Sequence, residues 1–170
     1  MLDETIIREV PPLTGCYGRR GQQVPVPISG HHARRVLHGV LNIHSGTLLL
    51  LITATGDQVT HQAFLHMIRS CWRGWHIVLF EDRGSPHTAS ESLTLAAQLG
   101  IEVRFLPVAT PELNAMDHLW RHMKRDALAN RPIQSIDAAA DAACQYLLQL
   151  SPRERLRKAG VLSGHFWLTL

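Results

Sequence analysis

The sequence of 170 residues predicts an α/β fold: a mixed sheet, built from a three-strand antiparallel meander plus parallel strands, flanked by helices. Two observations predict it. Extended segments with a hairpin turn occupy the first third of the chain, and after Gly56 short apolar runs alternate with segments of helical periodicity. Strand, helix and strand in so short a space predict a right-handed crossover, and therefore parallel pairing.

The first third predicts the meander. Residues 2–10 mix apolar and charged side chains and stop at Pro11 and Pro12, as a strand would. Residues 14–32 are rich in Gly and Pro and are expected to form a loop. Residues 33–57 are expected to form two strands around a turn at Ser45 and Gly46, an antiparallel hairpin.

The remainder predicts the helices and the parallel strands. Phe64, Ile68 and Trp72 recur at helical spacing, and the apolar run before Asp82 is typical of a strand buried on both faces. Thr88 with Glu91 has capping-box spacing, and Thr110 before Pro111 has the pattern of an N-cap. The expected helices are residues 60–72, 88–99, 110–129, 135–150 and 152–159, and the expected strands are 76–82 and 101–107.

This order of elements is that of the RNase H-like fold. There is no internal repeat and no segment with the composition of a linker, so residues 1–170 are expected to form a single domain.

Composition excludes several classes of protein. No window reaches the roughly 20 apolar residues of a membrane helix, and the N-terminus lacks a signal-peptide pattern. Three cysteines lie far apart without a C-x-x-C motif, which argues against a disulfide framework and a structural zinc site and fits a reducing compartment. We therefore expect a cytoplasmic protein without a membrane partner.

The charge permits a nucleic-acid partner. The net charge is +3, and 15 of the 17 basic residues are arginines, which suit forked contacts to phosphate. A mild excess of this kind is compatible with DNA binding without requiring it.

Three aspartates are the candidate site. Asp82 ends a predicted parallel strand, where ligands of open α/β sheets collect, and Asp3 lies in a first strand that is expected to be central. Asp117 lies at the edge of an apolar helix stripe. If these carboxylates converge they repel one another unless cations lie among them, and oxygen ligands suit Mg²⁺ or Mn²⁺. Two such ions are a known solution for phosphoryl transfer.

Each acid also has an ordinary explanation. An aspartate after a strand is most often a turn or capping residue, and one on a helix is most often a solvated charge. Glu4 and Glu81 alternate to the opposite side of their strands from the chosen acids. They are expected to support the neighbouring acids or to face solvent.

The motifs around these acids resemble mariner-type transposases, in the bacterial insertion-sequence branch. Between Asp82 and Asp117 lie 34 residues, as in that superfamily, and His87 follows Asp82 by five positions. The segment "PELNAMDHLWRHMK" is similar to the third-acid motif P-E-L-N-P-x-E/D-x-x-W-x-x-x-K, and "LDET" is similar to the first-acid motif. The resemblance extends over essentially the whole chain.

The resemblance implies an enzyme that uses two metal ions. Asp3, Asp82 and Asp117 would bind two Mg²⁺ or Mn²⁺ ions, with Glu4, His87, Asn114 and Lys124 as supporting or DNA-contacting residues. Such an enzyme nicks DNA at transposon ends with metal-activated water and joins the 3′-hydroxyl to target DNA, as a homodimer in a synaptic complex. Trp120, by helical spacing, is expected in the core rather than against a base.

Two departures from the family pattern matter. Ala115 stands where proline is usual, and Asp117 stands where many bacterial members carry glutamate. Only two residues precede Asp3, so we expect a catalytic domain without the N-terminal helix-turn-helix region that recognises transposon ends. A non-catalytic remnant that binds DNA or oligomerises is therefore the alternative function.

Other catalytic chemistries fit less well. His118 and His122 are four apart, but Leu119 stands where a zinc-hydrolase H-E-x-x-H motif needs glutamate. Ser85 lacks the flanking glycines of a nucleophile elbow. Two other pairs, His31 with His32 and His61 with His66, have no better claim to zinc and are expected to be solvated or to make polar contacts.

Overall fold

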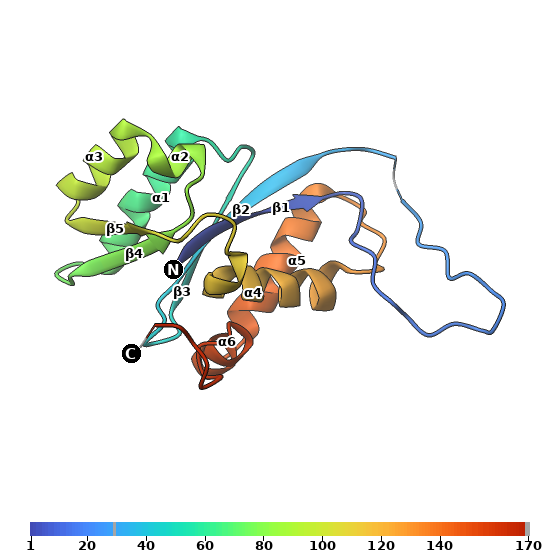
Figure 1. Cartoon of the computed structure of the whole chain (residues 1–170). Helices are drawn as coiled ribbons and strands as arrows, with labels where there is room; N and C mark the ends of the chain where they lie inside the picture. Colours follow the sequence, from blue (N-terminus) through green and yellow to red (C-terminus); the bar gives the residue numbers. More distant parts are fainter. Residues whose placement is uncertain (29, 169–170) are drawn as a thin grey trace.

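A computed structural model describes residues 1–28 and 30–168 and contains the predicted meander and parallel pair. The antiparallel sheet has the order β1-β2-β3, and β4 and β5 pair in parallel as a second hydrogen-bonded sheet. β1 packs beside β4, so the two sheets adjoin (Figure 1). The strands are β1 (Leu2–Arg8), β2 (Arg34–Leu41), β3 (Leu48–Thr53), β4 (Ile77–Glu81) and β5 (Ile101–Phe105).

Helices cover both faces of the strands (Figure 1). The first group lies on one side and the later group on the other, each over its own apolar cluster. The first group is α1 (Gln58–Cys71), α2 (Ser85–Thr88) and α3 (Ser90–Gln98). The second is α4 (Ala115–Met123), the π-helical turn η2 (Lys124–Leu128), α5 (Ile136–Gln149) and α6 (Pro152–Lys158).

The pleat of β2 shows how the sequence fills both layers. Leu37 and Leu41 join the cluster under α4 and α5, whereas Val40 joins the cluster under α1. His38 alternates to the same side as Val40. β1 follows the same rule, so Asp3 and Glu4 point to opposite faces of the sheet. Neighbouring acids in the sequence are therefore placed in different environments.

Gly39 brings α4 close to the sheet. A Cβ atom at this position would lie 2.5 Å from Met116 Cε and 2.6 Å from Trp120 Cη2. Both side chains are buried, so Trp120 is a core residue, as predicted. Gly39 is also the register partner of Asp3 in β1. The absence of a side chain in β2 therefore allows α4 to approach the strand that carries Asp3.

Two predicted helix starts are wrong. Thr88 ends α2, and its hydroxyl donates to the Gly84 carbonyl (3.1 Å), so it makes no capping box with Glu91. Thr110 donates to the Pro107 carbonyl (2.8 Å) and precedes a 3₁₀ turn, η1 (Pro111–Leu113). In both cases the hydroxyl bonds backwards along the chain, and a later residue begins the helix.

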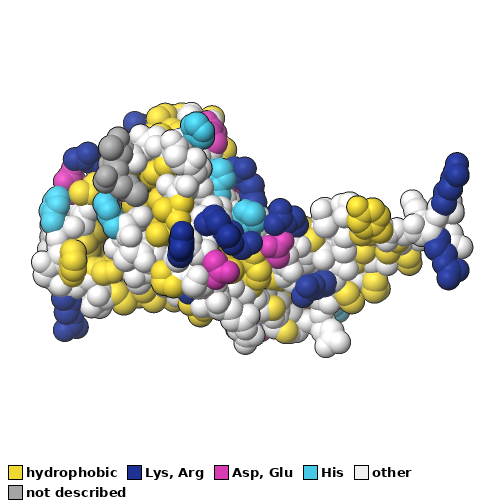
Figure 2. Space-filling model, turned by 90° about the horizontal axis from the view of Figure 1, so that it is seen from below, with side chains coloured by type: hydrophobic (Ala, Val, Ile, Leu, Met, Phe, Trp, Pro, Cys, Tyr) yellow, Lys and Arg dark blue, Asp and Glu magenta, His cyan; other side chains and the backbone are white. Residues whose placement is uncertain are grey.

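The loop between β1 and β2 projects from the body of the molecule (Figure 1). Its base is held by Asn130, whose side chain exchanges hydrogen bonds with the backbone of Thr14. Basic side chains mark its far end (Figure 2), where Arg19 and Arg20 are exposed. Among the helices that the structure describes, none has the length and apolarity needed to cross a bilayer.

Candidate active site

A cleft of about 370 Å³ is lined by all three predicted aspartates. Asp3 comes from β1, Asp82 directly follows β4, and Asp117 lies in the first turn of α4. Arg83, Gly84, Asn114 and residues 106–111 complete the wall. Three acids that are distant in the sequence thus share one cavity.

Asp3 is the most deeply placed of the three. Burial raises the pKa of its carboxyl, and the negative charges of Glu4, Asp82 and Asp117 raise it further, to about 7. A carboxyl that is perturbed by three others has them within electrostatic range. The three aspartates are therefore close enough to repel one another when ionised.

Asp82 is held at the end of β4 by two donors. Its Oδ1 accepts a hydrogen bond from His87 Nδ1 (2.7 Å) and another from the backbone N–H of Gly84 (2.8 Å). The hydrogen bond from His87 lowers the pKa of Asp82, and the bond from Gly84 adds to this effect. Asp82 is thus ionised and oriented, although its side chain is 58% exposed.

Asp117 is paired along its own helix. Its Oδ2 accepts a hydrogen bond from Arg121 Nε (2.9 Å), one turn later. Lys124 lies nearby: burial lowers the pKa of its ammonium, and the charges of Asp117 and Asp3 oppose that shift. Two cationic side chains of this helical segment therefore lie near the acids.

Asn114 ties the helix to the strand. The side chain is 3% exposed; its Oδ1 caps α4 by accepting from Met116 N (3.1 Å), and its Nδ2 donates to the Leu2 carbonyl (3.0 Å). One amide therefore fixes the start of α4 against β1. Because Asp3 follows Leu2 and Asp117 follows Met116, this bond sets the position of two acids at once.

Glu4 faces the other side of β1 and belongs to a buried hydrogen-bond network. Its Oε1 accepts from His38 Nδ1 (3.2 Å) and from His87 Nε2 (3.1 Å). Burial opposes ionisation, but these two hydrogen bonds lower the pKa of Glu4 to about 2. Glu4 therefore contacts Asp82 indirectly, through His87.

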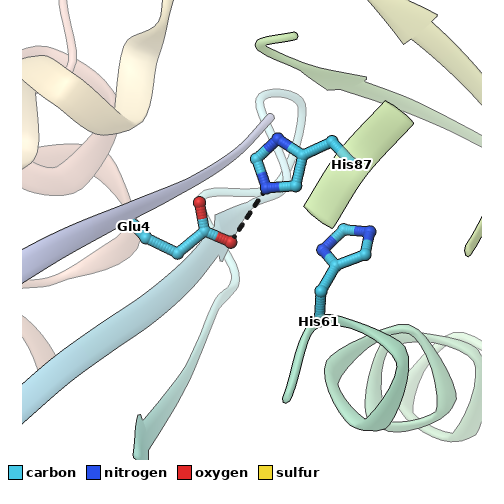
Figure 3. A group of neighbouring side chains, drawn as sticks. All are labelled: Glu4, His61 and His87. Carbon is cyan, nitrogen blue, oxygen red and sulfur yellow. Dashed lines mark hydrogen bonds and ion pairs between the residues drawn. The ribbon is translucent and has the colours of Figure 1, made fainter. Parts of the chain in front are cut away.

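His87 bridges two carboxylates, Asp82 and Glu4 (Figure 3 shows the contact with Glu4). Burial lowers the pKa of an imidazole, but the hydrogen bonds to Asp82 and Glu4 raise the pKa of His87 to about 11. The side chain is therefore a buried cation between two anions, and it locks the orientation of Asp82.

For Glu81 and His61 the structure selects the buried one of the two environments that the sequence left open. Glu81 does lie opposite Asp82, but it is completely buried rather than solvent-facing, and burial raises the pKa of its carboxyl to about 8. His61 is 1% exposed instead of solvated, and burial lowers its pKa to about 4. His61 Nε2 lies 3.8 Å from Glu81 Oε2. The cause is the alternation of β4, which turns Glu81 toward α1.

The donor set of the cleft fits a hard divalent cation. All three predicted ligands are carboxylates, the ligands that Mg²⁺ and Mn²⁺ prefer. Burial and then the neighbouring carboxylates raise the pKa of Asp3, and a bound cation would offset both effects. Asp82 and Asp117 are each turned toward a positive side chain. A second group of possible metal ligands among the described residues is Glu4, His61 and His87, whose ligand atoms lie within 4.8 Å of one another.

Sequence reasoning missed Arg121 beside Asp117 and two histidines, His38 and His61, on the opposite face of β1. His38 could have been found from its alternation with Val40 beside a strand that carries an acid, and Arg121 from its spacing of four from Asp117. His61 carries no such signal, because a histidine on an apolar helix face gives no indication of its partners.

Comparison with known proteins agrees with this architecture. The fold is RNase H-like, as predicted, and the cleft is acidic. Residues 1–139 match the model of the DDE superfamily endonuclease family, and the chain belongs to that family. None of the curated proteins matches the sequence significantly.

Solved structures of Mos1 transposase share the fold. The Mos1 paired-end complex with the left transposon end is 20% identical, with a TM-score of 0.74 over 97% of this chain and 52% of that one. The mariner Mos1 paired-end complex with Mg is 19% identical, with a TM-score of 0.76 over the same shares. The Mos1 catalytic domain is 16% identical, with a TM-score of 0.65 over 97% and 76%. The chain thus spans about half the length of the first two.

Proposed function

We propose that this chain is the catalytic domain, residues 1–170, of an insertion-sequence transposase that cleaves DNA at transposon ends and joins the 3′-hydroxyl to target DNA. The observation that carries the proposal is the single cleft that Asp3, Asp82 and Asp117 line together. Membership in the endonuclease family supports the same chemistry.

Asp3, Asp82 and Asp117 would hold two Mg²⁺ or Mn²⁺ ions. Such ions, when bound, act as Lewis acids at the phosphodiester and neutralise charge that develops in the transition state. Solved Mos1 structures with Mg and with Mn support the choice of metals. The protein contributes alignment more than a nucleophile of its own, which is what in-line attack at phosphorus requires.

The supporting residues have separate tasks in this scheme. His87 holds the Asp82 carboxylate in one orientation through its Nδ1, and Glu4 accepts a hydrogen bond from the Nε2 of the same imidazole. Asn114 fixes α4 against β1. Lys124, beside Asp117 and Asp3, supplies positive charge toward a bound phosphate backbone.

The proposed partners are transposon-end DNA and target DNA, bound by a homodimer in a synaptic complex in the cytoplasm. Support comes from Mos1, whose structures are paired-end and strand-transfer complexes.

Metal-dependent cleavage tests the proposal. The purified chain is incubated with supercoiled plasmid that carries the DNA flanking this reading frame, with Mn²⁺ or Mg²⁺, with and without a separately supplied end-binding domain. Nicks are expected with wild type and with Asp141→Asn, an exposed control on α5, and are expected to vanish with Asp82→Asn. Absence of nicking by wild type in every arm would favour the non-catalytic remnant.

A further inference from the structure

Behind the aspartate cleft lies a second cluster, here called the histidine pocket: Glu4, His61 and His87, with His38 and Glu81 around them. We propose that the histidine pocket binds one first-row transition-metal dication through Glu4, His61 and His87. Zn²⁺ is the probe for this class of metal.

The ligands come from three separate elements and converge. Glu4 lies on β1, His61 on α1 and His87 on α2, and one ligand atom from each lies within 4.8 Å of the others (Figure 3). Two imidazoles and one carboxylate suit Zn²⁺, Fe²⁺ or Co²⁺ better than Mg²⁺, which prefers oxygen. The donor set therefore differs in kind from that of the aspartate cleft.

Each ligand has a partner on its outer side. His87 Nδ1 contacts Asp82 Oδ1 (2.7 Å), and Glu4 accepts from His38 Nδ1 (3.2 Å). His61 Nε2 lies 3.8 Å from Glu81 Oε2. A carboxylate behind each histidine is the arrangement that orients imidazole ligands around protein-bound metals. The surroundings of the pocket are thus already those of a metal site.

The pocket also contains polar atoms that the described residues leave without a hydrogen bond. These are His61 Nδ1 and both carboxyl oxygens of Glu81, all buried. Buried polar atoms without partners are costly and uncommon in folded proteins. In Figure 3 a ring nitrogen of His61 is turned toward Glu4 and His87. A metal bound there would be coordinated by His61 Nδ1. The proton on His61 Nε2 would then face the Glu81 carboxylate.

Binding requires only a small adjustment. Zn²⁺ with bonds of about 2.0–2.1 Å holds tetrahedral ligand atoms about 3.4 Å apart, so ligand atoms now within 4.8 Å of one another must close by up to about 1.4 Å. The Nε2 proton that His87 donates to Glu4 is released to solvent, and bonds from Glu4 and His87 to the metal replace that hydrogen bond. Glu4, 21% exposed, is the point of entry.

The two sites lie on opposite faces of β1, because Asp3 and Glu4 are neighbours in a strand. They are coupled through His87, which contacts Glu4 at one nitrogen and Asp82 at the other. Metal in the histidine pocket would therefore fix His87 with its Nδ1 proton toward Asp82.

Zn²⁺ titration calorimetry of the purified full chain, in millimolar Mg²⁺, tests the proposal. We expect one Zn²⁺ per chain in wild type and an affinity at least about tenfold weaker in His61→Gln. His66→Gln, an exposed histidine on the same helix, is the matched control and should bind as wild type does. Asp117→Asn should also bind normally, which separates this site from the aspartate cleft.

Two outcomes would overturn the inference. Loss of binding in His122→Gln with retention in His61→Gln would place Zn²⁺ on the surface pair of α4. Loss in Asp117→Asn alone would place it among the aspartates. If His61→Gln fails to fold, X-ray absorption of Zn²⁺-loaded His122→Gln decides: two imidazole ligands support the histidine pocket, and none or one refutes it.

Discussion

The substitution Gly39→Ala tests how the fold positions the cleft. The new Cβ would lie 2.5 Å from Met116 Cε and 2.6 Å from Trp120 Cη2, where ordinary carbon contacts are about 3.5–4.0 Å. The indole is confined by the core, so α4 must move away from β2 by about 1 Å. Overpacking of this kind costs about 1–3 kcal/mol, which for a domain of this size lowers Tm by roughly 2–10 °C.

The assay combines thermal unfolding with metal-dependent nicking. Gly39→Ala should lower both Tm and the nicking rate, since α4 carries Asp117 out of alignment. Gly15→Ala is the control, because no atom lies within 4 Å of its added Cβ and its φ is not positive. A Gly39→Ala protein with wild-type Tm and rate would refute the idea that this glycine sets the distance from α4 to β1.

Three further predictions concern charge and capping. In metal-free buffer, Asp3→Asn should be more stable than wild type at pH 8 but not at pH 4. The folded-state pKa of Asp3 is raised to about 7, so the wild type loses stability as pH rises from about 4 to 7. Measurement of Tm as a function of pH tests this. Asn114→Ala should cost about 1–3 kcal/mol, as denaturant unfolding can show. Asn114→Asp should not recover this loss, because it keeps the cap but places an oxygen opposite the Leu2 carbonyl and adds a buried negative charge beside Asp3. Asp126→Asn should destabilise at pH 7 and progressively less as pH falls below about 4, because hydrogen bonds from Arg125 and Tyr146 hold the pKa of Asp126 below its usual range. A loss of stability that does not shrink on acidification would refute it.

The strands and their order could be predicted because their signals are local. The turn at Gly46, which has a φ of +72°, and the buried run before Asp82 each depend on a few consecutive residues. The family match and the fold confirm the family resemblance that the spacing between Asp82 and Asp117 predicted. The metal roles of the aspartates stay a prediction.

The histidine pocket could not be predicted. Glu4, His61 and His87 are separated by dozens of residues, and only the packing of α1 and α2 on one face of β1 brings them together. The sequence left open whether Glu81 supports Asp82 or faces solvent, because alternation alone does not say whether a helix covers the opposite face. The predicted starts of two helices were wrong for a local reason. The hydroxyls of Thr88 and Thr110 donate to carbonyls that precede them in the chain and do not cap the helices that follow.

The most direct test of the central claim, that Asp3, Asp82 and Asp117 form one cation site, is the thermal stability of the apo protein during titration with Mg²⁺ at pH 8. Saturation to about 100 times Kd should stabilise wild type by about 2.7 kcal/mol, a rise in Tm of roughly 5–10 °C. The rise should be absent in Asp3→Asn and complete in His61→Gln. An unchanged wild-type Tm at millimolar Mg²⁺, or an equal rise in Asp3→Asn, would contradict the claim.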